Sequence, residues 1–444
     1  MRAARSIRDR RFFLNSNINM DSSDSTSLRS REWVWALYDV ATSSFATTVM
    51  AAFFPVFFKQ FWARELPVTE STFWLGAVSS VGALVALVLA PVLGALSDAG
   101  GWKKPLLALC AFLGVAMTAG LFWIETGAWE LALLLYGLGL VGFSTGMVFY
   151  DALLPTVTVP SRFEHVSAFG VGMGYLGGGA LFAVNILMTQ KPEWFGLPDV
   201  TAAVRMSFLM VAVWWFVFTL PLLLVVREPS ARRASGSAVR AGLAQLRDTF
   251  KHVRRLKVVM LFLGAYWLYI DGVDTIVHMA VDYALAIGFD ASGLMLALLI
   301  TQVVGVPSTL AYGRLGQRFG AKASILVGLV TYALLVVWGS VMSRQWEFFG
   351  IAVGIGLVQG GVQAMSRALY ARIIPKEKSG EFFGFFNLLS KFAAVLGPVL
   401  VGVVSYATGE PRLSILALLV LFGLGGALLW YVDVAEGERC ASEL

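Results

Sequence analysis

Four ionisable side chains share one apolar segment: Asp271, Asp274, His278 and Asp282. The other three follow Asp271 by three, seven and eleven residues, which places all four near one face of a helix. Two carboxylates one turn apart resist simultaneous ionisation, so one of them would hold an exchangeable proton. A histidine beside this pair could relay protons at neutral pH. The pattern predicts proton handling by Asp271, Asp274 and His278, whereas Asp282, near the outer end, is expected to be solvated.

Lys391 is a candidate partner for these acids. It lies about eleven residues into another apolar segment, and Asp271 lies about fourteen residues into its own, so both would sit near the middle of a membrane. Two interpretations stay open. Lys391 forms a buried ionic contact with Asp271 and Asp274, or it meets the carboxylate of a substrate.

Further polar side chains occur in apolar segments at positions that suit a cavity. Asp39 and the adjacent Tyr38 are further candidates for transport or coupling. Asp39 either lines that cavity or caps a neighbouring loop, and its surroundings resemble those of Asp271. Three uncharged side chains supply donors and acceptors that suit a zwitterion, or that bond neighbouring helices to each other: Gln359, Gln363 and Asn387.

The composition places all these residues in lipid. Hydrophobic residues make up 58% of the 444 residues and charged residues only 14%, which is more apolar surface than a soluble domain can bury. The apolar runs are long and rich in glycine, unlike barrel strands with their period of two. At about 20 residues for each crossing helix, twelve spans are predicted, at 34–62, 72–96, 105–124, 130–157, 166–189, 203–226, 257–284, 291–312, 323–342, 347–373, 381–407 and 412–433.

We therefore expect an all-α integral membrane protein with two pseudo-symmetric six-helix bundles. The predicted parts are a basic disordered arm, the first bundle, a linker with a possible amphipathic helix, the second bundle and a tail, at 1–31, 32–226, 227–256, 257–433 and 434–444. Lysine and arginine gather in the arm, the linker and alternate loops, which predicts that both termini and the linker are cytoplasmic. The expected location is a bacterial inner (plasma) membrane.

A basic turn occurs twice, each time between two apolar segments. Residues 94–103 and 313–322 both read G-x-L-x-[D/Q]-x-x-G-x-K, and residues 137–141 match residues 354–358 in the same order. Parallel halves of this kind are typical of solute carriers that rock one half against the other. Residues near the inner surface are predicted to gate or latch that motion: Gly94, Asp98, Gly101, Lys103, Lys104, Asp151, Gly313, Arg318, Lys322, Arg367 and Glu381.

The duplicated turn resembles the signature loop of the major facilitator superfamily, and the resemblance covers nearly the whole chain after residue 30. Finer patterns resemble the vacuolar amino-acid effluxer family of autophagy and its bacterial relatives. They are Trp35-Ala36-Leu37-Tyr38-Asp39, Phe149-Tyr150-Asp151-Ala152-Leu153-Leu154-Pro155, Tyr269-Ile270-Asp271-Gly272-Val273-Asp274 and Gly356-Leu357-Val358-Gln359-Gly360-Gly361. Asp151 stands where many such relatives have Asn, and Ala99 stands where the superfamily loop has a basic residue. The resemblance implies a major facilitator fold and, for the eukaryotic branch, export of amino acids.

These observations predict secondary active transport of a small solute, possibly an amino acid, by alternating access and with protons as the coupling ion. No HExxH, P-loop or GxSxG motif is present, and two cysteines give neither a disulfide framework nor a metal site. We therefore expect no enzyme activity, no cofactor, no metal, no nucleic-acid partner and a monomer in the bilayer. The alternatives are a broad-specificity drug or metabolite exporter and a transport-inactive membrane sensor or interaction protein.

Overall fold

The computed structural model describes residues 22–228, 256–286, 292–408 and 414–443, and all regular elements in these ranges are helical. The side chains of His278, Asp282 and Lys391 lie outside the described residues. So do the predicted arm up to residue 21 and most of the predicted linker. Helix α2 begins at Ser22, ten residues before the predicted start of the first bundle at residue 32.

The first half contains six long helical segments. They are α2 (Ser22–Ser44) with its continuation, α4 (Val68–Gly100), α5 (Lys103–Gly120), α6 (Trp129–Ala152), α8 (Phe163–Gln190) and α9 (Val200–Val225). Short elements join them: α7 (Leu154–Val157), η3 (Leu121–Trp123), η4 (Pro160–Arg162) and η5 (Pro192–Phe195). Asp199 fixes the start of α9, because its carboxylate accepts the N–H of Ala202 at 2.7 Å.

The first span is not a uniform α-helix. After α2 it continues as π-helical η1 (Phe45–Phe53), a short α3 (Phe54–Phe57) and π-helical η2 (Phe58–Trp62). The N–H of Phe54 reaches the carbonyl of Val49, and that of Ala63 reaches Phe58, which are the longer bonds of π geometry. The hydropathy pattern did not predict this π-helical conformation, which is often found at functional positions.

The second half repeats the plan. Its helices are α11 (Lys257–Ala286), α12 (Ser292–Phe319), α13 (Ala321–Val341), α14 (Gln345–Ile373), α15 (Ser379–Thr408), α17 (Leu418–Trp430) and α18 (Val434–Ser442), with η6 (Lys376–Lys378) before α15. In the described ranges, ten helices are long and apolar enough to cross a membrane, or up to eleven if the bent pair α17 and α18 forms one span. The ten helices, the pair α17 and α18, and α15, which spans Ser379–Thr408, correspond one for one to the twelve predicted spans.

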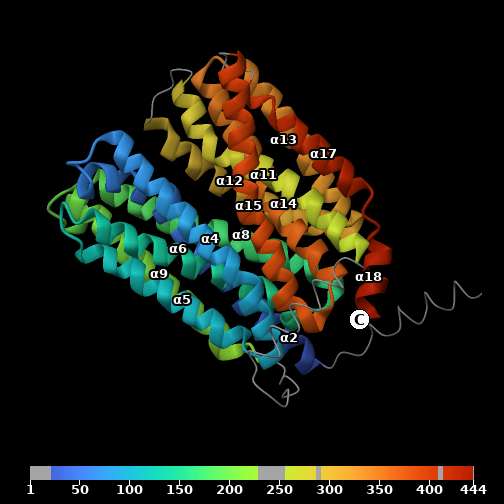
Figure 1. The fold of residues 1–444 in the computed structure, drawn as a ribbon. Coiled ribbons are helices and arrows are strands. Elements are labelled where there is room, and N and C mark those ends of the chain that lie inside the picture. Colours follow the sequence, from blue (N-terminus) through green and yellow to red (C-terminus); the bar gives the residue numbers. More distant parts are fainter. Residues whose placement is uncertain (1–21, 229–255, 287–291, 409–413, 444) are drawn as a thin grey trace, which may run out of the picture.

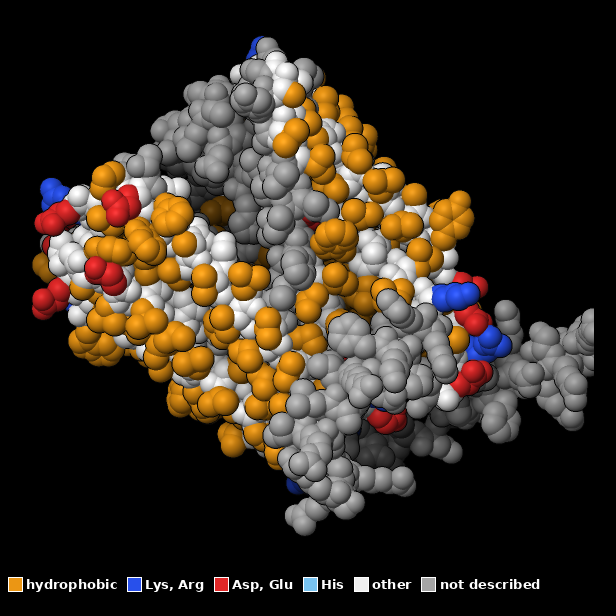
Figure 2. Space-filling view, viewed as in Figure 1, with side chains coloured by type: hydrophobic (Ala, Val, Ile, Leu, Met, Phe, Trp, Pro, Cys, Tyr) orange, Lys and Arg blue, Asp and Glu red, His pale blue; other side chains and the backbone are white. Residues whose placement is uncertain are grey.

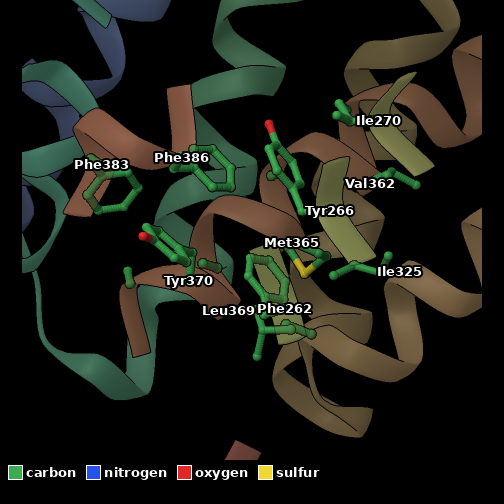
Figure 3. Packing of buried hydrophobic residues seen from close by; sticks show 14 of the residues in the cluster. Phe262, Tyr266, Ile270, Ile325, Val362, Met365, Leu369, Tyr370, Phe383 and Phe386 are labelled. Atoms are coloured by element: carbon green, nitrogen blue, oxygen red, sulfur yellow. The ribbon is translucent and has the colours of Figure 1, made fainter. Parts of the chain in front are cut away.

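The outer surface suits lipid. Hydrophobic side chains cover most of the described surface in view, and charged side chains gather toward its two ends (Figure 2). Inside the second half, aromatic rings join three helices (Figure 3). The ring of Phe386 in α15 lies 4.1 Å from that of Tyr266 in α11 and 5.0 Å from that of Tyr370 in α14. These ring contacts pack α11, α14 and α15 against one another.

The two halves converge at one end of the molecule, near the start of α2 and helix α18, and diverge toward the other end (Figure 1). We call the converging end the basic end, because lysine and arginine residues gather there. Four helices finish at this end, α4, α6, α12 and α14, and four begin there, α5, α8, α13 and α15. Here α4 crosses α15 and α8 crosses α12. A Cβ atom at Gly94 would lie 2.3 Å from the carbonyl oxygen of Gly380, so only glycine allows this approach.

Candidate functional site

Arg367 forms the centre of a buried polar cluster between the halves. It lies about two turns before the end of α14 and is 5% exposed. Its Nε donates to Ser167 Oγ at 2.8 Å and its NH2 donates to the Ser167 carbonyl at 3.0 Å. The same guanidinium contacts Asp151 Oδ1 at 3.2 Å and Asp39 Oδ2 at 3.4 Å. One side chain of the second half therefore holds α2, α6 and α8 of the first.

Each carboxylate of this cluster has a second donor. The Tyr150 hydroxyl donates to Asp39 Oδ2 at 2.6 Å, and Asn387 Nδ2 of α15 donates to Asp151 Oδ2 at 3.0 Å. Asp39 and Asp151 are both buried. Two carboxylates and one guanidinium leave one negative charge in excess, unless one of the acids carries a proton. A buried arrangement of this kind is costly unless its geometry satisfies every charge.

Aromatic rings enclose the guanidinium. Trp35 stacks on Tyr150 with ring centroids 4.4 Å apart, and the Arg367 Cζ lies 4.8 Å from the Trp35 ring and 5.3 Å from the Tyr150 ring. Cation–π contacts of this kind strengthen when water is excluded. A Cβ atom at Gly170 of α8 would lie 2.5 Å from Asp39 Oδ2. The glycine at this position therefore leaves the space that Asp39 occupies.

A second contact between the halves joins the end of α4 to the start of α15. Asp98 accepts the backbone N–H groups of Gly380 at 3.0 Å and Glu381 at 2.8 Å, and pairs with Lys103 Nζ at 2.8 Å. Lys103 also donates to Ser379 Oγ at 2.9 Å. The carboxylate thus caps the helix that begins in the other half, where free N–H groups favour negative charge.

A third contact lies at the start of α8. Arg372 of α14 binds Glu164 through two parallel hydrogen bonds, of 2.6 Å from Nε and 2.7 Å from NH2. The guanidinium also contacts Glu438 of α18 at 3.3 Å. Paired bonds between a guanidinium and a carboxylate are among the stronger polar contacts in proteins. Together the three contacts hold the basic end closed.

Comparison with known proteins identifies the family. The family model described as "Vacuole effluxer Atg22 like" matches residues 27–162 and 158–442. The chain belongs to this Atg22-like family. The MFS-type transporter YxiO of Bacillus subtilis is 36% identical over 400 residues, which cover 90% of this chain and 94% of that protein. Autophagy-related protein 22-1 of Neosartorya fischeri is 27% identical over 306 residues, and this chain spans about half of the fungal protein, 49%.

Solved structures give the fold. The proton:xylose symporter XylE matches with a TM-score of 0.69 over 92% of this chain and 96% of that one, at 12% identity. The human organic anion transporter MFSD10 matches with a TM-score of 0.70 over 90% and 99%, at 16% identity. The predicted major facilitator fold is thereby confirmed. The Atg22-like chain is an integral membrane transporter of small solutes in this superfamily, not an enzyme.

The structure brings together residues that the sequence separated by role. Asp39 was a coupling candidate, Asp151 and Arg367 were gate candidates, and Asn387 was a cavity candidate, yet all four meet in one cluster. Tyr38 meets this cluster through Tyr150, because the centroids of the two rings lie 5.0 Å apart. The sequence analysis did not assign roles to Trp35, Tyr150 and Ser167. Trp35 precedes Asp39 by one helical turn and Tyr150 adjoins Asp151, so their positions beside two acids were the available signal.

Among the other predicted gate residues, two lysines bond to carbonyl groups of their own half. Lys104 Nζ donates to the Val226 carbonyl at the end of α9, and Lys322 Nζ donates to the Trp430 and Val432 carbonyls at 2.6 and 2.9 Å. Arg318 lies over the ring of the adjacent Phe319. Glu381 is fully buried at the start of α15. Gly101 and Gly320 each adopt a positive φ, of 65° and 88°, in the turn after their helix.

Asp271 lies away from the Arg367 cluster. It is fully buried, and its Oδ1 accepts the N–H of Gly397 in α15 at 2.9 Å. Asp274, Gln359 and Gln363 are half-buried in the second half. Because the side chains of His278 and Lys391 lie outside the described residues, their proposed contacts with Asp271 and Asp274 stay predictions.

Proposed function

We propose that this transporter moves an amino acid across the membrane by alternating access, coupled to protons through the Arg367 cluster. The observation that supports this proposal most is that one guanidinium contacts two carboxylates of the opposite half. Opening of the basic end would separate α14 from α2 and α6. The conformational change and the charge state of the acids would therefore be linked.

The direction of the linkage follows from charge. With the basic end closed, Arg367, Tyr150 and Asn387 stabilise ionised Asp39 and Asp151. Protonation of Asp39 or Asp151 would remove the attraction of that acid to Arg367, which only the closed conformation provides. A proton taken up by Asp39 or Asp151 would thus favour opening, and its release would favour closure. Asp271 and Asp274 stay the second pair of candidate carriers.

An amino acid is the substrate class that the resemblance to vacuolar amino-acid effluxers favours, and the chain belongs to the family of vacuole effluxers. The half-buried amides of Gln359 and Gln363 suit a zwitterion, because they can donate to a carboxylate and accept from an ammonium group. We further propose a bacterial plasma membrane with both termini cytoplasmic. The bacterial relative that this chain matches over most of its length and the charge of the basic end support this location.

Transport by purified protein in liposomes tests the proposal. Amino-acid accumulation driven by a pH gradient is measured beside exchange, which needs no net proton movement. We expect Asp39→Asn or Asp151→Asn to lose at least tenfold of the driven accumulation while exchange persists, because the variant side chain cannot release a proton. Asp199→Asn is the matched control, since Asp199 caps α9 at the opposite end.

Three results would count against parts of this proposal. Full driven accumulation in both Asp39→Asn and Asp151→Asn would exclude the cluster as the proton carrier. Loss of driven accumulation in Asp271→Asn or Asp274→Asn, but not in the two cluster variants, would assign the role of proton carrier to α11. Absence of any amino-acid exchange by active protein that exports lipophilic cations would overturn the substrate class.

A further inference from the structure

A polar cavity of about 400 Å³ opens at the basic end, away from the Arg367 cluster. Its lining comes from α2 and from the start of α8: Arg29, Glu32, Trp33, Arg162, His165, Val166 and Phe169. None of these residues belongs to the set described above that holds Arg367. The cavity is therefore a separate feature of the first half that the transport mechanism does not use.

The cavity carries an excess of positive charge. Glu32 is neutralised within it, because its two oxygens accept Arg162 Nε at 2.8 Å and NH2 at 2.7 Å, and Thr158 adds a third bond. Arg29 is exposed at the cavity, and His165 is half-buried in it. An anion with a single charge would thus meet Arg29, whose charge is not compensated by an ion pair in the described part of the chain.

A further arginine reaches this region from the other half. A Cβ atom at Gly313 of α12 would lie 2.9 Å from the Cβ of Ala168 and 3.6 Å from the Cα of His165, so α12 lies directly against the start of α8. Arg314 follows Gly313 and is exposed, so its charge lies next to the start of α8. The positive charge around the cavity therefore spans the boundary between the halves.

Apolar surface leads away from the cavity along α8. Trp33 is 53% exposed and meets Phe169 edge-on at 4.6 Å, a pair typical of the membrane interface. Leu176, seven residues after Phe169 and on the same face, is 52% exposed.

Farther along α8, Ala180, Leu181 and Val184 line an apolar groove of about 640 Å³ against α9, whose wall includes Trp214 and Phe218. Ala180 lies eleven positions after Phe169, which corresponds to about 17 Å along the helix. One leaflet of a bilayer has a hydrocarbon depth of about 15 Å. An acyl chain whose head lies in the polar cavity would thus pass Phe169 and Leu176 and end at the start of the apolar groove.

We propose that an anionic phospholipid binds here, with its phosphate between Arg29, His165 and Arg314 and an acyl chain along α8 in the groove beside α9. Basic pockets between membrane helices are suited to such headgroups. Because Arg314 belongs to the second half, the lipid bridges α8 and α12 only while the basic end is closed. Bound lipid therefore favours the closed conformation.

The test uses delipidated full-length protein in detergent and measures the thermal unfolding midpoint. We expect phosphatidylglycerol to raise the midpoint, and phosphatidylcholine, glycerol phosphate and inorganic phosphate to have much smaller effects. The double change Arg29→Gln with Arg314→Gln should weaken the apparent affinity for phosphatidylglycerol about tenfold or more. The matched control is Arg31→Gln with Arg318→Gln, which removes the same charge from the same two helices.

Each alternative outcome identifies what is wrong. Equal weakening in the control pair would mean that net charge, not this cavity, attracts the lipid. Equal stabilisation by phosphatidylcholine would overturn the anionic preference, and equal stabilisation by glycerol phosphate would overturn the role of the acyl chain. A change of Ala180→Phe, which fills the groove without removing charge, should also reduce the lipid effect. Because these measurements need no transport, they stand independently of the substrate and the coupling ion.

Discussion

The two copies of the duplicated turn, residues 94–103 and 313–322, share their packing and differ in their charges. In both copies the first glycine lies against the other half: a Cβ atom would lie 2.3 Å from Gly380 O at Gly94 and 2.9 Å from Ala168 Cβ at Gly313. In both, the second glycine has a positive φ. Only the first copy bears a buried acid, since the side chain of Asp98 is 1% exposed, whereas its counterpart Gln317 is exposed.

The lysines explain how the copies diverged in role. In the first half, Lys104 binds the carbonyl at the end of α9, which leaves Lys103 to pair with Asp98. In the second half, Lys322 binds the carbonyls after α17, and the next residue is Ala323. The polar contact on that side comes from other elements, through Arg372 and Glu164. The two copies therefore share the close packing of a glycine against a helix of the other half. The charged residues that close the basic end differ between the α4–α15 contact and the α8–α12 side.

The largest expected effect comes from the part that both copies share. Gly94→Val and Gly313→Val should each reduce transport more than tenfold, because a side chain at either position prevents the close approach of α4 to α15 or of α8 to α12. Gly76→Val, in α4 with no atom within 4 Å of its Cβ position, is the control and should transport normally. Transport rates in liposomes are measured beside solvent labelling of Ser97→Cys, a position buried between α4 and α15, in a background that lacks Cys110 and Cys440. Labelling reports whether the basic end stays open. Normal closure in Gly94→Val would contradict this view of the interface.

An intermediate effect should separate the two copies. Asp98→Asn should slow transport about tenfold while substrate affinity changes little, because the amide cannot accept both N–H groups of α15 and the closed conformation loses stability. Gln317→Ala removes an exposed side chain and should leave the rate unchanged. Rates and half-saturation concentrations for the two variants measure this asymmetry. Equal losses in both would show that the copies act alike despite their different charges.

Sequence alone predicted the helices well, because a span needs a long apolar run and charged residues mark its ends. The span predicted at 323–342 is α13 at Ala321–Val341, and the one predicted at 412–433 contains α17 at Leu418–Trp430. The π-helical part of the first span was missed, since the same apolar residues suit either helix type.

The composition of the site could not be read from local spacing. Asp39, Asp151 and Arg367 stand on three helices, and they meet only because α14 packs with its Arg367 face toward α2 and α6. Periodicity within one segment instead drew attention to Asp271 and Asp274, which share a helix. Short-range patterns detect residues that lie one turn apart, whereas contacts between halves depend on how whole helices are rotated and placed.

The smallest expected effect concerns the backbone of the two turns. Gly101 follows α4 at φ 65° and ψ 41°, a left-handed conformation in which a Cβ atom costs about 1 kcal/mol. Gly320 follows α12 at φ 88° and ψ 152°, a conformation that essentially only glycine adopts. Gly101→Ala should therefore lower stability by about 1 kcal/mol and Gly320→Ala by more, up to about 3 kcal/mol, with transport retained in both. The matched control is Gly264→Ala, inside α11 with open space at its Cβ position, where alanine favours the helix. Thermal unfolding of the three variants in one detergent provides the comparison. If only Gly101→Ala lost transport, the backbone of the first turn would have a role beyond ending its helix, and the asymmetry between the copies would extend from their charges to their backbone.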